Sequence, residues 1–312
     1  MDTTMDNRRG QFVPQAEDRL KVLQNIAYNE RNGLFNKDVE ADAPTVPIDV
    51  DKLDLLNAKW TNKLISMFAN RAGKKFFKKY LTEPKVIYKG TTGLHHLEGF
   101  DGGAMVTCNH CHIFDNFASY LALKEHFKSR RYILHKVVRE GNYSYPGLIG
   151  YLMRHCNTLP VQETDKTSIR VTMETSRAIT TLLQRKKQIL IYPEQAMWWN
   201  YKKPRPFKRG AFHFAAKNNA PIIPFFITLK DTDIMGKDGF LVQEFTVNIH
   251  PIIYPDPQNT VSQNLDMMMT KNFQLWKETY ERVYGIPLEY STVEQAELAG
   301  GIDVGEKKIL LP

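Results

Sequence analysis

Short apolar runs alternate with longer amphipathic segments over most of the chain, and this pattern predicts the main elements. From residue 85 onward the runs have the length of strands, and the segments between them have the three- and four-residue spacing of helices. Strands are expected at 86–88, 104–108, 131–138, 158–161, 188–192, 221–228 and 241–253. Helices are expected at 116–127, 167–185, 211–217 and 265–284. This order indicates an α/β fold, with a mainly parallel central sheet flanked by helices and preceded by an N-terminal helical segment.

The first part of the chain has a different pattern. Leu20, Leu23 and Ile26 predict a short helix, which leads into an acidic stretch that contains proline. Such a stretch is typical of a linker. The expected parts of the chain are therefore an N-terminal appendage and linker (1–50), a helical segment (51–84), the α/β domain (85–285) and a C-terminal extension (286–312).

The segment 51–84 is basic and amphipathic. Its apolar positions recur at spacings of three and four: Leu53, Leu56, Trp60, Leu64, Met67 and Phe68. A basic and aromatic cluster follows: Lys74, Lys75, Phe76, Phe77, Lys78, Lys79 and Tyr80. One interpretation is a helix packed on the domain with its lysines in water. The other is an interfacial helix that buries its aromatic face in lipid while the lysines meet anionic headgroups.

Charge favours polyanionic partners. The 312 residues include 42 basic and 34 acidic ones, which gives a formal charge of +8. Such an excess suits nucleic acid, anionic lipid headgroups or phosphorylated substrates, and it does not choose among them.

The location is expected to be cytoplasmic. The three cysteines, Cys108, Cys111 and Cys156, cannot form a full set of disulfides, which favours a reducing compartment. The polar N-terminus predicts no signal peptide. A membrane-spanning helix needs about 20 consecutive apolar residues, and no run of that kind occurs. Any membrane contact is therefore expected to be peripheral, on the inner face of a membrane.

One predicted strand ends in a histidine, and an aspartate follows shortly after it. His110 comes directly after the apolar run 104–108, and Asp115 stands where the next helix is expected to begin. Taken alone, Asp115 is a good N-cap residue. Five residues of turn also allow its carboxylate to reach one ring nitrogen of His110. The other nitrogen is then free to accept a proton, which predicts a general base.

A second predicted strand ends in Tyr192 and Pro193, and a carboxylate, Glu194, follows. A basic and aromatic run comes next, over 198–209. Gly210 is suited to start the helix 211–217, and free N–H groups at a helix start bind anions. The residues beside this helix start, Lys208 and Arg209, are therefore candidates for binding an anionic group.

With these residues in place, the chain resembles the lysophosphatidic-acid (1-acylglycerol-3-phosphate) acyltransferase family of the glycerolipid acyltransferase superfamily. Its members share four sequence blocks in a fixed order. The matching residues, block by block, are Asn109, His110 and Asp115; 159–163; Tyr192, Pro193 and Glu194; and 221–224, preceded by 207–211. The resemblance covers roughly 85–249. A single block is a weak signal, whereas their order and spacing together are specific.

The resemblance implies transfer of a fatty acyl group from acyl-CoA or acyl carrier protein to the hydroxyl of a lyso-lipid such as lysophosphatidic acid. His110 is then the general base and Asp115 orients it, with no acyl-enzyme, no metal and no cofactor beyond the acyl donor. The substrate-binding residues are expected to be Asn109, Glu194, Lys208, Arg209 and Gly210. The expected partners are the lyso-lipid, the acyl donor and an anionic membrane surface, and no nucleic acid.

The chain departs from the family pattern at two places. Glu163 stands where the second block usually has an arginine that meets the acceptor's phosphate. The third block continues as Gln195-Ala196-Met197 in place of Gly-Thr-Arg. Either a basic residue takes over the phosphate, or the acceptor is not lysophosphatidic acid. The candidates are Lys202, Lys203, Lys208 and Arg209.

Other interpretations have less support from the sequence. The run 108–112 offers cysteine and histidine ligands for zinc, and it has no second ligand pair further along the chain. No Gly-x-Ser-x-Gly elbow and no complete phosphate-binding loop occur. A basic nucleic-acid-binding protein stays open, because aromatic and basic residues interleave over 198–209. So does a lipid-binding relative without catalysis, although His110 and Asp115 argue against it.

Overall fold

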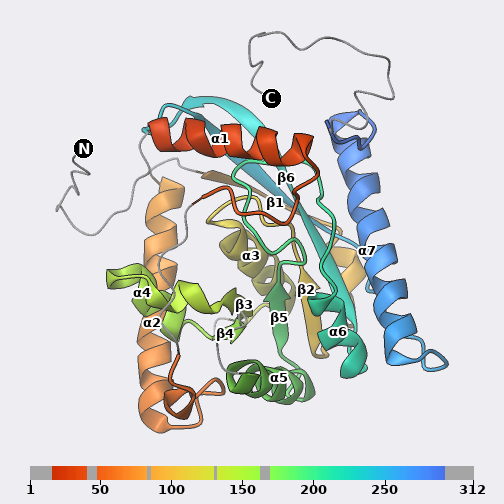
Figure 1. The fold of residues 1–312 in the computed structure, drawn as a ribbon. Coiled ribbons are helices and arrows are strands. Elements are labelled where there is room, and N and C mark those ends of the chain that lie inside the picture. Colours follow the sequence, from red (N-terminus) through yellow and green to blue (C-terminus); the bar gives the residue numbers. More distant parts are fainter. Residues whose placement is uncertain (1–15, 41–47, 83–85, 130–131, 162–168, 292–312) are drawn as a thin grey trace.

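The computed structural model describes residues 16–40, 48–82, 86–129, 132–161 and 169–291 (Figure 1). Within them, one seven-stranded sheet has the order β1-β7-β6-β2-β5-β3-β4. Its strands are β1 (Val86–Thr92), β2 (Ala104–Thr107), β3 (His135–Arg139), β4 (Thr158–Val161), β5 (Gln188–Ile191), β6 (Ile222–Met235) and β7 (Leu241–Ile249). The helices are α1 (Ala16–Arg31), α2 (Trp60–Thr82), α3 (Asp115–Phe127), α4 (Gly147–His155), α5 (Ile169–Gln184), α6 (Gly210–Lys217) and α7 (Val261–Tyr284). The expected α/β class is confirmed.

Five neighbouring strands run in parallel, from β6 to β4, and β2 pairs with both β5 and β6. The strand β7 is antiparallel to β6, and β1 is parallel to β7, so these two strands at one side of the sheet run the other way. The carboxyl ends of β2 and β5 therefore meet at one edge of the sheet. In α/β sheets this edge is where functional side chains gather.

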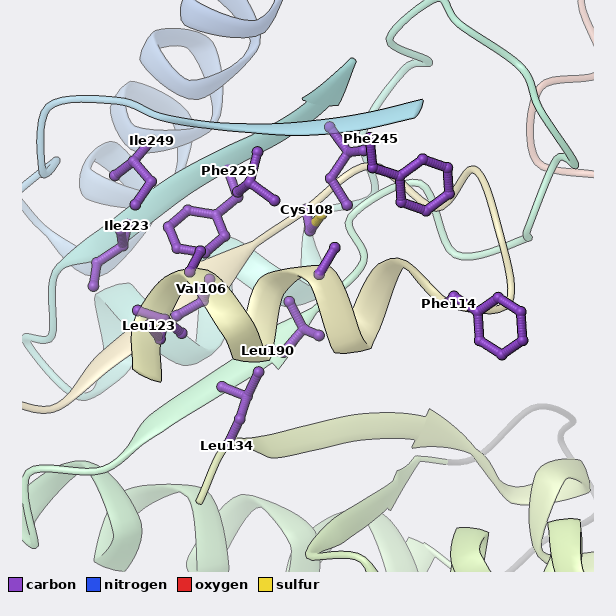
Figure 2. Close-up of a cluster of buried hydrophobic side chains, with 14 of the residues drawn as sticks. Val106, Cys108, Phe114, Leu123, Leu134, Leu190, Ile223, Phe225, Phe245 and Ile249 are labelled. Carbon is purple, nitrogen blue, oxygen red and sulfur yellow. The ribbon is translucent and has the colours of Figure 1, made fainter. Parts of the chain in front are cut away.

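The central strands bury side chains on both faces. Val106 of β2 and Leu190 of β5 belong to one apolar cluster, which α3 covers. Their neighbours Met105 and Ile189 belong to a second cluster, which α5, α6 and α7 cover. Figure 2 shows the first cluster, with side chains of α3 against those of the central strands. Helices on both faces explain why these strands read as continuous apolar runs in the sequence.

Residues 16–40, which belong to the expected N-terminal appendage, pack against the sheet domain. Val22 and Ile26 of α1 are buried together with Trp198 and Trp199, which follow β5. The indole N–H of Trp198 donates to the carbonyl of Lys37 at 2.9 Å. In Figure 1, α1 lies across the top of the molecule. Residues 41–47 of the expected linker lie outside the described residues.

The two halves of α2 have different surroundings. The helix begins at Trp60 rather than at residue 51, and a 3-10 turn occupies 50–52. Phe77 in the second half is buried and stacks on Phe117 of α3, with 4.3 Å between the ring centroids. Trp60 and Phe68 in the first half are 72% and 60% exposed. Packing on the domain therefore describes the second half, and the first half keeps an uncovered apolar face.

Among the described residues, none of the helices combines the length and the apolarity that crossing a bilayer requires.

Several boundaries differ from the expected ones. The helix α4 was not expected, and β6 continues to Met235 because it stays paired with β7 beyond its apolar part. The expected strand 131–138 begins only at His135, and 241–253 ends at Ile249. Further 3-10 turns occupy 94–97 and 140–144.

The last helix and the end of the described chain close the domain. Thr260 caps α7 through a reciprocal pair of hydrogen bonds with Gln263, and Gly285 ends it at a φ of 70°. The hydroxyl of Tyr290 then donates to the carbonyl of Pro204 at 2.6 Å. The first residues of the expected C-terminal extension therefore contact the domain, and 292–312 lie outside the described residues.

Candidate active site

The structure brings His110 and Asp115 together at the carboxyl end of β2. Nδ1 of His110 lies 2.7 Å from Oδ2 of Asp115, and the two side chains are 23% and 1% exposed. Asp115 is the first residue of α3, with Phe114 at the N-cap position, so its carboxylate is not a helix cap. The buried carboxylate and the partly exposed imidazole form the pair that the five-residue spacing predicted.

Three protein donors fix the carboxylate of Asp115. The hydroxyl of Tyr192 donates to Oδ1 at 2.6 Å, and the backbone N–H of His112 donates to Oδ2 at 3.3 Å, beside His110. A carboxylate only accepts, so Nδ1 of His110 carries the hydrogen in this pair. Nε2 is then the nitrogen with a free lone pair, which is the arrangement that a general base needs.

The ring of Tyr192 stacks on His110, with 3.9 Å between centroids and 12° between planes. Burial raises the pKa of the Tyr192 phenol, and the charge of Asp115 adds to the effect, so the hydroxyl stays a donor. The sequence pattern indicated no role for Tyr192. Its place directly before Pro-Glu, at the end of β5, was the available signal.

Glu194 also lies at this edge of the sheet, and its contacts differ from the expected contact with the acceptor. Its carboxylate is 2% exposed and lies 3.0 Å from the guanidinium of Arg205, which is 1% exposed. It also accepts from the backbone N–H groups of His110 at 3.0 Å and Arg205 at 2.7 Å. Both oxygens are therefore occupied by protein donors, whereas the expected role of Glu194 was to bind the acceptor.

Asn109 is likewise turned inward. Its side-chain amide donates to the carbonyl of Ile227 at 3.0 Å and accepts from the N–H of Ile227 at 2.7 Å. The side chain thus continues the pairing of β2 with β6 past the end of β2. The side chain of Asn109 is buried and stabilises the turn, whereas a contact with the substrate was expected.

The basic residues before α6 lie at this same edge. The backbone N–H of Lys208 donates to the carbonyl of Pro193 at 2.8 Å, and its side chain is exposed. Arg209 pairs with Asp266 of α7 at 2.5 Å. Gly210 begins α6, and a Cβ there would meet open space, so packing does not require a glycine. Of these residues, Arg209 is held in an ion pair. Lys208 is not held in such a pair with any described residue, and it presents an exposed cation two residues before the start of α6.

The two departures from the family pattern differ in what the structure shows. Glu163 lies outside the described residues. Gln195 adopts a φ of 64°, in the left-handed region that glycine occupies without strain. The turn therefore keeps the shape that suits the glycine of the family pattern.

The remaining rival features are buried. Cys108 and Cys111 lie in the apolar cluster beneath α3, and Nδ1 of His112 accepts from the N–H of Phe114. Burial lowers the pKa of His112 to about 3, so its ring is neutral. Within the described ranges, no three histidine, cysteine or acidic side chains are placed to hold one metal ion. Trp198 and Arg205 are buried too, and they offer no exposed platform on which bases stack.

Part of the chain is similar to known proteins. Residues 85–228 match the family model described as Acyltransferase. Among solved structures, the chain is similar to the crystal structure of PlsC, the 1-acyl-sn-glycerophosphate (LPA) acyltransferase of Thermotoga maritima. The identity is 16% and the TM-score is 0.45, over 88% of this chain and 100% of that one. No match was found among curated proteins.

The thiols beside His110 are expected to be unreactive. Burial raises the pKa of Cys108 and Cys111, and the nearby charge of Asp115 adds to this effect, so little thiolate forms at pH 8. Labelling of both by Ellman's reagent should be at least about 100-fold slower in the native protein than in denaturant. Ile113→Cys, at an exposed position of the same turn, is the control and should react at once. Fast native labelling of Cys108 or Cys111, located by mass spectrometry, would contradict the packing described.

Proposed function

We propose that the chain transfers a fatty acyl group to a lyso-lipid hydroxyl, and the match of residues 85–228 to the Acyltransferase family model supports this proposal. The donor is acyl-CoA or acyl carrier protein, and the acceptor is a lyso-lipid such as lysophosphatidic acid. The observation that carries the proposal is the 2.7 Å contact between His110 and Asp115, which lies inside the matched segment.

The proposed reaction is a single displacement at the thioester. Nε2 of His110 removes the proton of the acceptor hydroxyl while the oxygen attacks the thioester carbonyl carbon. Asp115 holds the ring and balances the charge of the imidazolium that forms. The tetrahedral intermediate then expels the sulfur, and His110 returns the proton to the leaving thiol. The products are the acylated lipid and the free thiol of the carrier.

Direct transfer is favoured over an acyl-enzyme. Cys108, Cys111 and Ser119 lie within a few residues of the pair along the chain, and all three side chains are buried. The hydroxyl of Ser119 is turned to the sulfur of Cys108 at 3.6 Å. The raised pKa of both thiols removes the thiolate that a covalent route on cysteine needs.

We assign the acceptor's phosphate to Lys208. Its backbone N–H is bonded to the carbonyl of Pro193, which follows β5, and its side chain is exposed two residues before the start of α6. Arg209 is held in an ion pair with Asp266, so it contributes less. A lysine beside free N–H groups at a helix start suits a phosphate monoester.

The exposed face of α2 is proposed to dock on an anionic bilayer. The uncovered apolar side chains are Trp60, Leu64, Met67 and Phe68. Exposed basic residues flank them, at Lys59, Lys63 and Arg71. This combination of apolar and cationic side chains is complementary to acyl chains below phosphate headgroups. The protein is then bound peripherally to the cytoplasmic face of a membrane, where its site can reach lyso-lipids.

Packed aromatic side chains also connect the docking helix α2 to the site. Phe77 in the second half of α2 packs on Phe114 and Phe117, which flank Asp115 at the start of α3. A bilayer held by the first half of α2 is thereby kept in a fixed relation to the helix that carries Asp115.

The first test of the function changes the pair. Purified protein is incubated with labelled acyl-CoA and a panel of lyso-lipids, and the products are separated. His110→Ala should lower turnover by at least about 100-fold, because a positioned base contributes that much. Asp115→Asn should lose most activity, because it favours the wrong tautomer. His112→Asn, which keeps an acceptor for the N–H of Phe114, is the control and should stay active. Near wild-type turnover of His110→Ala would refute the mechanism.

The second test concerns the phosphate. Lys208→Ala should raise the KM for lysophosphatidic acid by roughly tenfold or more, the usual worth of a charge-assisted hydrogen bond. The KM for an uncharged acceptor should barely change. Lys217→Ala, at the other end of α6, is the matched control. If Lys208→Ala uses lysophosphatidic acid as well as wild type does, the acceptor is a lipid without a phosphate monoester at this position.

The third test concerns docking. Trp60→Ser/Phe68→Ser should weaken binding to vesicles with anionic lipid by roughly tenfold or more, because two aromatic side chains no longer enter the interface. Ile169→Ser/Met173→Ser removes two other exposed apolar side chains, on α5, and should leave vesicle binding intact. If Trp60→Ser/Phe68→Ser instead changes the oligomeric state and leaves vesicle binding intact, this face is a contact between copies of the chain.

A further inference from the structure

The backbone of His110 is held on both sides by the loop that follows β5. Its N–H donates to the carboxylate of Glu194 at 3.0 Å, and its carbonyl accepts from the N–H of Trp198 at 3.0 Å. One residue on, the carbonyl of Cys111 accepts from the N–H of Asn200 at 2.8 Å. The direction in which the imidazole points therefore depends on the loop 194–200, far away along the chain.

A buried ion pair fixes that loop. Besides Glu194, the guanidinium of Arg205 donates to the carbonyl of Phe35 at 3.1 Å and to that of Ala196. It also lies over the ring of Trp198, 4.6 Å from the centroid. One side chain thus joins Glu194, Ala196 and Trp198 of the loop to the segment after α1. The side chain of Arg205 is 1% exposed, and a charge removed from water is costly when it has no partner.

From these contacts we propose that Arg205 and Glu194 are positioning residues for His110, and this inference rests on the proposed function. Glu194 accepts three N–H donors with two oxygens, and one of the donors belongs to His110. A carboxylate can accept them all at once, whereas an amide has a single oxygen and turns an NH₂ group toward a donor. Arg205 keeps the carboxylate charged and in place. Neither residue touches the reacting atoms.

The N-terminal segment extends this support outward. The carbonyls of Phe35 and Lys37 accept from Arg205 and Trp198, and Lys203 pairs with Glu30 at 2.6 Å. None of these three contacts involves a group of His110. They connect residues 30–37 to the geometry of the base, although the segment contributes no group to the chemistry.

The test separates positioning from binding by the kinetic constants. In Glu194→Gln, kcat should fall by about 100-fold, the cost of a displacement of roughly 1 Å at a reacting group. The KM for both substrates should stay near that of wild type. If Glu194 instead meets the acceptor, as the family resemblance implied, the acceptor KM rises while kcat holds. That outcome overturns the inference.

Two further variants separate positioning from loss of stability. Glu194→Gln and Arg205→Met each leave one buried charge without its partner, which destabilises a protein strongly. The double variant Glu194→Gln/Arg205→Met removes both charges, so it should recover the melting temperature and not the lost kcat. Recovery of kcat to the wild-type value would overturn the inference. The control is Arg19→Met: Arg19 is buried over Trp199 at 4.5 Å and pairs with Glu40, and no hydrogen bond joins it to Glu194 or His110. It should lose stability and keep kcat.

A spectroscopic readout makes the test independent of the proposed reaction. The N–H proton at Nδ1 of His110, bonded to Asp115, is observed by NMR in protein labelled with ¹⁵N at its nine histidines and is assigned by its loss in His110→Gln. It should shift or broaden in Glu194→Gln and stay in place in Arg19→Met. An unchanged signal in Glu194→Gln overturns the inference. If wild-type protein transfers no acyl group, the proposed function fails by itself, and this signal still decides the positioning role.

Discussion

The parallel pairing of β2 with β5 is the constraint on which the site depends. Thr107 lies opposite Ile191, so His110 and Glu194 each follow the last paired residue by the same three positions. The hydrogen bond from His110 to Glu194 therefore continues the ladder beyond both strands, with a side chain in place of a strand carbonyl. A slip of one residue would exchange the faces of all paired side chains, and this bond would be lost together with the two apolar clusters.

The charges at this edge are deeply buried, and this explains the number of donors around them. Asp115 and Glu194 together accept from backbone N–H groups, a phenol, an imidazole and a guanidinium. In such surroundings a carboxylate without partners would be protonated or would disrupt the packing. Each charge therefore defines the position of every group bonded to it. The stiffness of His110 thus follows from the cost of leaving either carboxylate unsatisfied.

The sequence predicted those parts of the fold that depend on local pattern. Continuous apolar runs identified the strands buried on both faces, since helices cover both sides of the sheet. The helix α4 was missed because Gly147 and Gly150 lower helix propensity. Packing requires the second of these glycines: a Cβ there would lie 1.6 Å from the carbonyl oxygen of Tyr145. The polar end of β6 was missed because its pairing with β7, and not its hydrophobicity, keeps it extended.

The same distinction between local pattern and long-range contacts applies to the residues of the site. The pairing of His110 with Asp115 spans five residues, so spacing alone predicted it, whereas Glu194 and Asn109 are bonded to groups 84 and 118 residues away. Polar side chains after strands resemble ligands for a substrate, and here two of them replace backbone partners that the ending strands no longer provide. Their inward direction separates them from His110, which is 23% exposed, and from the exposed Lys208. In the proposed reaction, His110 acts on the hydroxyl of the acceptor and Lys208 binds its phosphate.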